Sequence, residues 1–185
     1  MHICCAPCSI YPYKELTENK TDSVVGFFYN PNIHPYTEYN LRKDSVEEYS
    51  KKTGLEVIFH KYDIENFFRQ VSGHERFRER CQVCWRMRLE ETAGYAAKNN
   101  FNFFTTTLLV SPYQDQDAIR QIGSDISAHS GVNFIYKDFR SGFRASQEEA
   151  KKEALYRQRY CGCVFSERER YEKFKTQSSK RKTTV

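Results

Sequence analysis

Seven cysteines lie in three tight groups that are far apart in the chain. The first group is C-C-A-P-C at residues 4–8, the second is C-Q-V-C at residues 81–84, and the third is C-G-C at residues 161–163. Thiolates are preferred ligands of soft metals, and a site built from several of them needs separate segments to meet. The grouping therefore predicts a metal or redox centre that the fold assembles.

A single structural zinc ion is a weaker explanation of this pattern. Zinc takes four ligands, and zinc ribbons usually pair two C-x-x-C motifs within about 15–20 residues. The groups here are further apart, and one ion would leave three thiols without a role. A thioredoxin-like exchange site is also less favoured, because no predicted strand leads into residues 81–84.

A [4Fe–4S] cluster agrees better with the thiols, since it takes four thiolates and allows neighbouring cysteines to bind different irons. The predicted cluster ligands are Cys4, Cys5, Cys81 and Cys84. The three remaining thiols are Cys8, Cys161 and Cys163. They form either a redox-active site, because a C-x-C disulfide is strained and easily reduced, or the ligands of a second metal ion. Both interpretations place reducing chemistry at the same site.

Length and composition predict one globular domain, since 185 residues with 39% hydrophobic content can build a core. We expect a catalytic domain over residues 1–176 and a basic, disordered tail over residues 177–185. No run of about 18 apolar residues and no signal sequence is visible, which predicts a cytoplasmic protein without a membrane partner. Thiols stay reduced in that compartment.

The net charge of +5 is mildly basic, and arginines gather near the second and third cysteine groups. These are Arg76, Arg78, Arg80, Arg86, Arg88, Arg157 and Arg159. Arginines beside a candidate site suggest a polyanionic substrate. Arginine also covers many ordinary helix faces, so both interpretations stay open at this point.

Strand and helix patterns alternate along the chain. Predicted strands cover residues 24–29, 55–60, 101–106 and 132–136, and residues 1–3 are the only apolar start for a first strand. Predicted helices cover residues 36–53, 64–71, 84–98, 114–129, 147–159 and 165–175. This alternation predicts an α/β fold, a single-domain parallel-sheet sandwich with helices on both faces. Ligands of such folds bind beyond the carboxyl ends of the strands, where the first cysteine group is expected.

The motifs, in this order, closely resemble the epoxyqueuosine reductase family of the QueH type. The resemblance runs from about His2 to Ser166. It rests on H-I-C-C-A-P-C-S, F-Y-N-P-N-I-H-P, R-C-Q-V-C-W-R-M-R-L, T-T-T-L-L-V-S-P-Y and L-Y-R-Q-R-Y-C-G-C-V-F-S. It implies a nucleotide-hydrolase-like (HUP/Rossmann-like) fold, a [4Fe–4S] cluster and an adjacent mononuclear iron. The implied reaction is cobalamin-independent removal of the epoxide oxygen of epoxyqueuosine at the tRNA wobble position, which gives queuosine.

This deoxygenation consumes two electrons and two protons and releases water, so it needs an external electron donor and a nearby acid. Candidate acids at the predicted strand ends are Asp63, His34 and Tyr113. Asp63 is better explained as the cap of the helix that starts at Ile64. His34 lies between prolines, where it is either a site residue or a hydrogen-bonded turn residue.

The same reasoning predicts contacts with tRNA. Asn30 and Asn32 would bind base edges, and Arg42, Arg157 and Arg159 would meet phosphates. Tyr156, Tyr160 and Trp85 would stack on bases, although such aromatic residues are more often part of the core.

Two other functions compete with this hypothesis. A sulfur-inserting adenylating enzyme would need an S-G-G-x-D-S phosphate loop where this chain has C-C-A-P-C-S. A non-catalytic, zinc-bound RNA-binding module would not need surplus thiols. Metal analysis distinguishes the second alternative from the reductase.

Overall fold

The computed structural model describes residues 1–18 and 23–172. The elements are α1 (Ala6–Thr17), β1 (Gly26–Phe28), α2 (Tyr36–Thr53), β2 (Val57–Phe59), α3 (Ile64–Val71), α4 (Glu79–Lys98), β3 (Phe103–Phe104), a 3-10 turn (Thr107–Val110), α5 (Gln116–Ser130), β4 (Asn133–Phe134), a 3-10 turn (Arg140–Gly142) and α6 (Phe143–Lys152). Residues 164–172 are also helical. The predicted tail at 177–185 and the end of the helix predicted over 165–175 lie outside the described residues.

All strand pairing between the named strands is parallel. β1 pairs with β2, with Gly26 opposite Val57, and β3 pairs with β4, with Phe103 opposite Asn133. His2 forms parallel bridges to Phe27 on one side and to Thr106 on the other. The parallel segments therefore follow the order β2, β1, His2, β3, β4, and the prediction of an α/β fold with parallel strands is confirmed.

The direction in which the chain adds strands reverses at His2. β1 and β2 lie on one side of this residue, and β3 and β4 lie on the other. Open parallel sheets bind their ligands at such a reversal, beyond the carboxyl end of the central segment. The residues that follow His2 are Ile3, Cys4 and Cys5.

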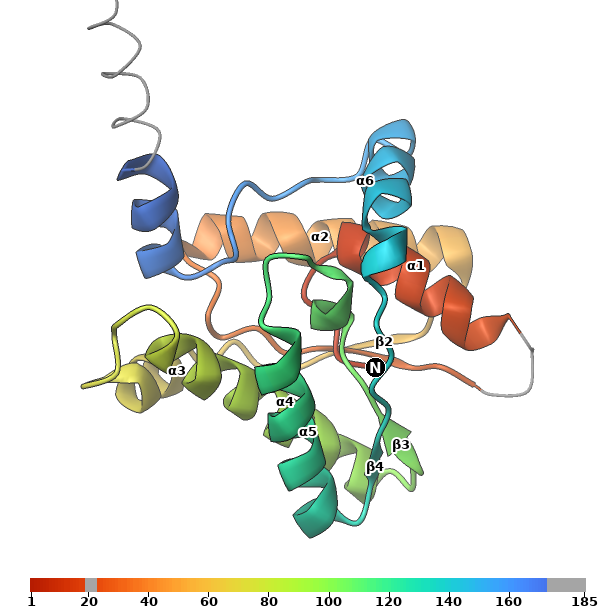
Figure 1. Ribbon diagram of the computed structural model, residues 1–185. Helices are drawn as coiled ribbons and strands as arrows, with labels where there is room; N and C mark the ends of the chain where they lie inside the picture. Colours follow the sequence, from red (N-terminus) through yellow and green to blue (C-terminus); the bar gives the residue numbers. More distant parts are fainter. Residues whose placement is uncertain (19–22, 173–185) are drawn as a thin grey trace, which may run out of the picture.

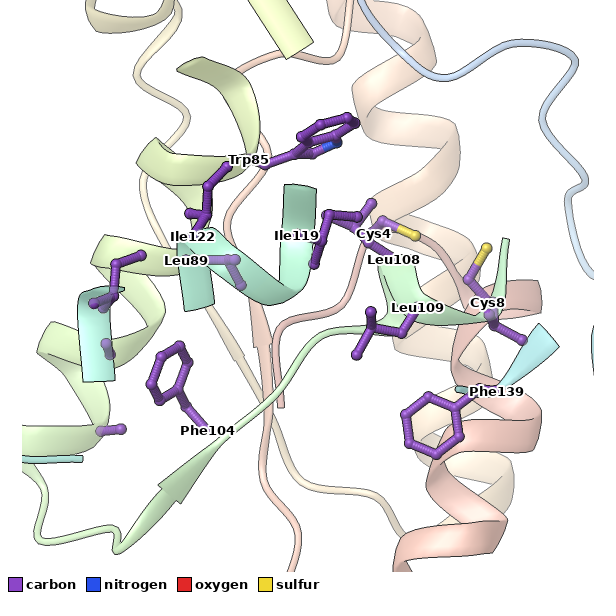
Figure 2. Packing of buried hydrophobic residues seen from close by; sticks show 14 of the residues in the cluster. Cys4, Cys8, Trp85, Leu89, Phe104, Leu108, Leu109, Ile119, Ile122 and Phe139 are labelled. Atoms are coloured by element: carbon purple, nitrogen blue, oxygen red, sulfur yellow. The ribbon is translucent and has the colours of Figure 1, made fainter. Parts of the chain in front are cut away.

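Helices lie on either side of the strands, with α1, α2 and α6 on one side and α3, α4 and α5 on the other (Figure 1). Side chains of α4 and α5 form a core with β3, which includes Leu89, Phe104 and Ile119. Figure 2 shows that this core extends to Leu108, Leu109 and the thiols of Cys4 and Cys8. The first cysteine group thus rests on a packed support.

Two predicted helices agree with the structure at both ends, α2 and α3. α4 begins at Glu79 rather than at residue 84, so both cysteines of the second group belong to its first turns. The sequence pattern does not predict α1, because this segment contains Pro7 and Pro12. Pro7 is in the first turn, where proline is well tolerated, whereas Pro12 lies inside the helix. In the described ranges, none of the helices combines the length and apolar character that a bilayer span needs.

The helix predicted over residues 147–159 is wrong beyond Lys152. α6 ends there, and Ala154 takes a positive φ of 55°, a left-handed conformation that commonly ends a helix. The Leu155 amide then bonds back to the Ala150 carbonyl at 2.9 Å. Residues 155–163 have neither helix nor strand, and we call them the third-group segment because they carry Cys161 and Cys163.

Candidate metal centre

The first cysteine group lies at the junction between His2 and α1. Cys5 is the N-cap residue of α1, and Cys8 is in the first turn of this helix. The Sγ atoms of Cys4, Cys5 and Cys8 all lie within 4.8 Å of one another, and the three residues are buried. Three converging thiols are the chemistry that a soft metal ion requires, so these residues fit a metal.

The protons of this group are unequally shared. Hydrogen bonds from the Cys5 and Cys8 thiols, together with the Arg88 charge, hold the pKa of Cys4 well below its ordinary value. Burial raises the pKa of Cys5, and hydrogen bonds with its two neighbours raise the pKa of Cys8. Cys4 is therefore the thiol of this group that loses its proton most readily, and a metal cation would displace the protons that remain on the group.

The second and third cysteine groups lie within electrostatic range of each other. Burial raises the pKa of Cys81 to about 11 and that of Cys84 to about 12, and negative charge on Cys161 and Cys163 contributes to both shifts. Desolvation by the surrounding protein likewise raises the pKa of the Cys161 thiol, although the residue as a whole is exposed at the surface. All seven cysteines lie in the described residues and are free thiols.

Arg88 carries a buried positive charge that acts on thiols of all three groups. Its side chain is 2% exposed, its Nε donates to His2 Nε2 at 3.2 Å, and its Nη2 donates to Asn30 Oδ1 at 2.8 Å. Its Nη1 lies 3.7 Å from the Cys84 Sγ. The guanidinium charge lowers the pKa values of Cys4, Cys84 and Cys161, although other effects dominate at each thiol. This role was missed in the sequence, where Arg88 was grouped with arginines that would face a polyanion.

Two glutamine amides also reach the thiols. Gln158 Nε2 lies 3.0 Å from the Cys5 Sγ, and Gln114 Nε2 lies 3.7 Å from the Cys161 Sγ. The orientation of Gln114 is set by Trp85, whose indole donates to Gln114 Oε1 at 2.9 Å. Amide donors next to thiolates tune a metal centre, and no sequence motif marked these glutamines.

The candidate acids differ in their surroundings. Asp63 Oδ1 accepts the Asn66 amide at 3.1 Å, so its interpretation as a helix cap is confirmed. Tyr113 is 82% exposed. It directly precedes Gln114, whose amide reaches the Cys161 thiol. His34 is buried against Phe67 and Phe68, and burial lowers its pKa to about 4, so the ring is neutral at pH 7.

Three predicted tRNA contacts are located inside the protein instead. Asn30 is buried, and its Nδ2 donates to the Ile3 carbonyl at 2.8 Å. Asn32 is buried close to Gly162, and Arg42 is buried among backbone carbonyls. The polar groups of Asn30 and Arg42 are engaged by the fold, which differs from the base and phosphate contacts that the sequence suggested. The buried Oδ1 of Asn32 has no hydrogen-bond partner among the described residues.

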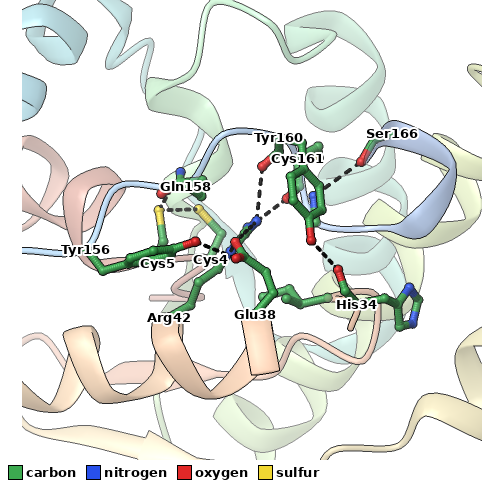
Figure 3. A network of polar contacts seen from close by, with 12 residues as sticks. Cys4, Cys5, His34, Glu38, Arg42, Tyr156, Gln158, Tyr160, Cys161 and Ser166 are labelled. Carbon is green, nitrogen blue, oxygen red and sulfur yellow. Dashed lines mark hydrogen bonds and ion pairs between the residues drawn. The ribbon is translucent and has the colours of Figure 1, made fainter. Parts of the chain in front are cut away.

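The other predicted contacts fall into two classes. Arg157 and Arg159 are exposed on the third-group segment, as a phosphate contact requires. Trp85 is part of the core, as its type and spacing suggest. Tyr156 and Tyr160 are half-buried, and their hydroxyls bond to Glu38 and to the His34 carbonyl (Figure 3).

Comparison with known proteins adds an independent finding. The family model described as epoxyqueuosine reductase QueH matches residues 1–169. A protein of that name from Dehalococcoides mccartyi is 38% identical, and the match covers 94% of this chain and 94% of the relative. A second from Thermotoga maritima is 36% identical over 98% of this chain and 96% of the relative. A third from Streptococcus pyogenes is 37% identical over 90% of this chain and 69% of the relative. The chain therefore belongs to the epoxyqueuosine reductase QueH family.

Proposed function

We propose that this chain reduces the epoxide of epoxyqueuosine in tRNA to give queuosine, at a metal centre held by its clustered thiols. Family membership over residues 1–169 makes the chain an oxidoreductase of queuosine biosynthesis with tRNA as its substrate. The observation that carries the metal centre is the convergence of Cys4, Cys5 and Cys8 at the point where the strand order reverses. The reaction belongs in the cytosol, where thiols stay reduced.

The centre that we propose is a [4Fe–4S] cluster on Cys4, Cys5, Cys81 and Cys84. Cys8, Cys161 and Cys163 then bind an adjacent iron or form a redox-active site. The Cys8 Sγ lies within 4.8 Å of the Sγ atoms of Cys4 and Cys5. This short distance supports a second site, on Cys8, that lies next to the cluster on Cys4 and Cys5. The number of thiols supports this proposal, since one zinc ion would use only four of the seven.

We also propose that residues 1–176 form one catalytic domain of the nucleotide-hydrolase-like type, with a parallel sheet covered on both faces. The order β2, β1, His2, β3, β4 supports this architecture. The site then lies where ligands of such sheets bind.

The chemistry that such a group supplies when bound is electron transfer and Lewis acidity toward the epoxide oxygen. The protein has the remaining tasks. Arg42 and Arg88 offset the negative charge of the thiolates, and Gln114 and Gln158 donate amide protons to them. The burial of Cys4, Cys5 and Cys8 keeps bulk water away.

Removal of the epoxide oxygen as water takes two protons, and the two electrons come from a donor outside this chain. Asp63 is occupied as a helix cap, so the proposed proton donors at the site are His34 and Tyr113. Tyr113 is the stronger candidate, since its side chain is exposed and its hydroxyl group can donate a hydrogen bond to a bound substrate. The neutral ring of His34 is buried.

The test is iron and sulfide analysis, with a visible spectrum, on protein that is purified and reconstituted without oxygen. About four irons and four sulfides, with absorbance that dithionite bleaches, agree with the proposed cluster. The same sample should convert epoxyqueuosine to queuosine in tRNA, and a further iron lost in Cys163→Ser would place the second metal at the third group. Zinc alone, without sulfide or colour, would contradict the reductase centre and favour the RNA-binding module.

A further inference from the structure

Arg42 is a buried cation, and each nitrogen of its guanidinium group donates a hydrogen bond to a group inside the protein. It belongs to α2 and is 2% exposed. Its Nε donates to Glu38 Oε1 at 2.8 Å, its Nη1 to the Cys161 carbonyl at 2.9 Å, and its Nη2 to the Tyr160 carbonyl at 3.1 Å. Burying a charge is costly unless it is paired and hydrogen-bonded, so a buried arginine in this state indicates a position that the fold requires.

The carbonyls that Arg42 binds belong to the third-group segment, which has no helix or strand to order its backbone. Several hydrogen bonds from α2 and from the turn before it hold the segment instead. The His34 amide donates to the Gly162 carbonyl at 2.8 Å, and the Tyr156 amide donates to Ser45 Oγ at 3.2 Å. Figure 3 shows how the side chains of Arg42, Glu38, Tyr156 and Tyr160 link α2 to this segment.

The close approach of Gly162 to Arg42 shows how tight this attachment is. Gly162 has a φ of 146°, which favours glycine, and a Cβ on it would lie 3.0 Å from Asn32 Nδ2 and 3.4 Å from Arg42 Nη1. The residue between the two cysteines of the third group therefore passes directly over the guanidinium. Any displacement of Arg42 would move the backbone that carries both thiols.

We propose that Arg42 is a positioning residue that fixes the Cys161 and Cys163 thiols against the other cysteine groups and supplies positive charge beside Cys5 and Cys161. This inference rests on the proposed function, because it assigns the third group to the reducing centre. Its planar group makes two donations to adjacent carbonyls, which lysine cannot reproduce with the same geometry. Its carboxylate partner Glu38 keeps the guanidinium oriented, and Tyr156 orients Glu38 in turn.

The first test measures the thiols without any bound metal. The full-length, metal-free chain is treated with iodoacetamide, and the alkylation rates of Cys161 and Cys163 are compared with that of Cys81 in the same sample. Arg42→Gln should raise the rate at the half-buried Cys163 several-fold, because release of the segment exposes this thiol, and leave Cys81 unchanged. The matched control is Arg120→Gln on α5, because Arg120 is exposed and pairs with Asp117 within its own helix.

Arg42→Gln leaves Glu38 buried beside fewer partners, which could unfold the chain. The double variant Arg42→Gln with Glu38→Gln removes both charges and should give the same increase at Cys163. Arg42→Lys keeps the charge but loses the paired donation, so it should fall between the wild type and Arg42→Gln. Wild-type alkylation rates in the double variant would overturn the proposal.

The second test uses reconstituted protein and tRNA that carries epoxyqueuosine. If Arg42 positions the centre, Arg42→Gln should lower kcat by about tenfold or more and leave KM for tRNA nearly unchanged. A rise in KM with unchanged kcat would show that Arg42 serves tRNA binding instead and would overturn the assignment. If the wild type itself lacked activity, the proposed function would fail, while the alkylation comparison would still decide whether Arg42 holds the third group.

Discussion

The buried guanidinium of Arg88 lacks the usual counterion. Its partners among the described residues are the His2 ring, the Asn30 amide oxygen and the Cys84 sulfur. A buried cation that meets only neutral groups destabilises a fold, since its loss of hydration is not repaid. Its countercharge is therefore the thiolate group, beginning with Cys4, whose pKa is lowered. The buried charge of Arg88 is therefore a physical reason for an anionic centre beside it.

This charge balance predicts that Arg88→Met lowers both the stability of the fold and its affinity for metal. Methionine fills the buried space, but it leaves the His2 ring and the Asn30 Oδ1 without their donor and Cys4 without its countercharge. The metal-free variant should therefore unfold at a lower temperature than the wild type. Its affinity for ferrous iron should fall by about 10–100-fold, which competition with a chelator measures.

The control for Arg88→Met is Arg86→Met, because Arg86 is on the same helix, its side chain is 44% exposed, and it pairs with Glu90 and Asp125 at the surface. This control should bind iron like the wild type. Unchanged iron affinity in Arg88→Met would show that the guanidinium does not support the centre.

Elements with local signals could be predicted from the sequence. α3 starts after the cap Asp63, and α2 ends at Gly54 in the left-handed conformation. Residues next to each boundary therefore determine where these helices start or end. The third-group segment has no such signal, because its order comes from Arg42 and His34, which are more than a hundred residues away in sequence. For the same reason, the burial of Asn30 and Arg42 could not be predicted, whereas the cysteine grouping and the α/β alternation could.

Two glycine substitutions, one in this segment and one in α4, should change the free energy of unfolding in opposite directions. Gly162→Ala should lower the free energy of unfolding by about 1–3 kcal/mol, because its positive φ is strained for alanine and its Cβ would press on Asn32. Gly94→Ala should raise the free energy of unfolding by about 0.5–1 kcal/mol, because Gly94 is inside α4 and a Cβ there meets nothing within 4 Å. Urea unfolding of the metal-free chain measures both values.

The two glycine variants also differ in what they do to the thiols. Gly162→Ala should increase the alkylation of Cys163 in the folded state, whereas Gly94→Ala should not. Equal stability of the two variants would mean that the chain passes over Arg42 less closely than the structure shows.

The proposed metal centre exists only after the sheet of the whole molecule has formed. The first cysteine group follows the central segment, the second begins α4, and the third is held by α2 from the opposite side of the strands (Figure 1). Each group alone offers two or three thiols, which is too few for the proposed centre. The sequence predicts which thiols meet, and the fold decides their distances and their neighbours.

The stability of the folded molecule should therefore depend on pH through a residue that joins two of these parts. His34 is buried between α3 and the third-group segment, and its Nδ1 accepts the Val164 amide at 3.4 Å. Its pKa is lowered to about 4, below the ordinary value of 6.5, so the unfolded chain binds a proton that the folded chain does not. The stabilisation from the neutral ring is complete above pH 6.5 and is lost as the pH falls from 6.5 toward 4.

The slope from this one group is at most about 1.4 kcal/mol per pH unit, and most carboxylates titrate at lower pH. Urea unfolding of the metal-free chain at pH 7, 6 and 5 measures it, and His34→Gln should reduce the slope. His129→Gln is the control, because His129 is exposed near the end of α5. An equal slope in His34→Gln and wild type would mean that the ring is protonated in the folded chain, and the contact between α3 and the third-group segment would then tolerate a charge.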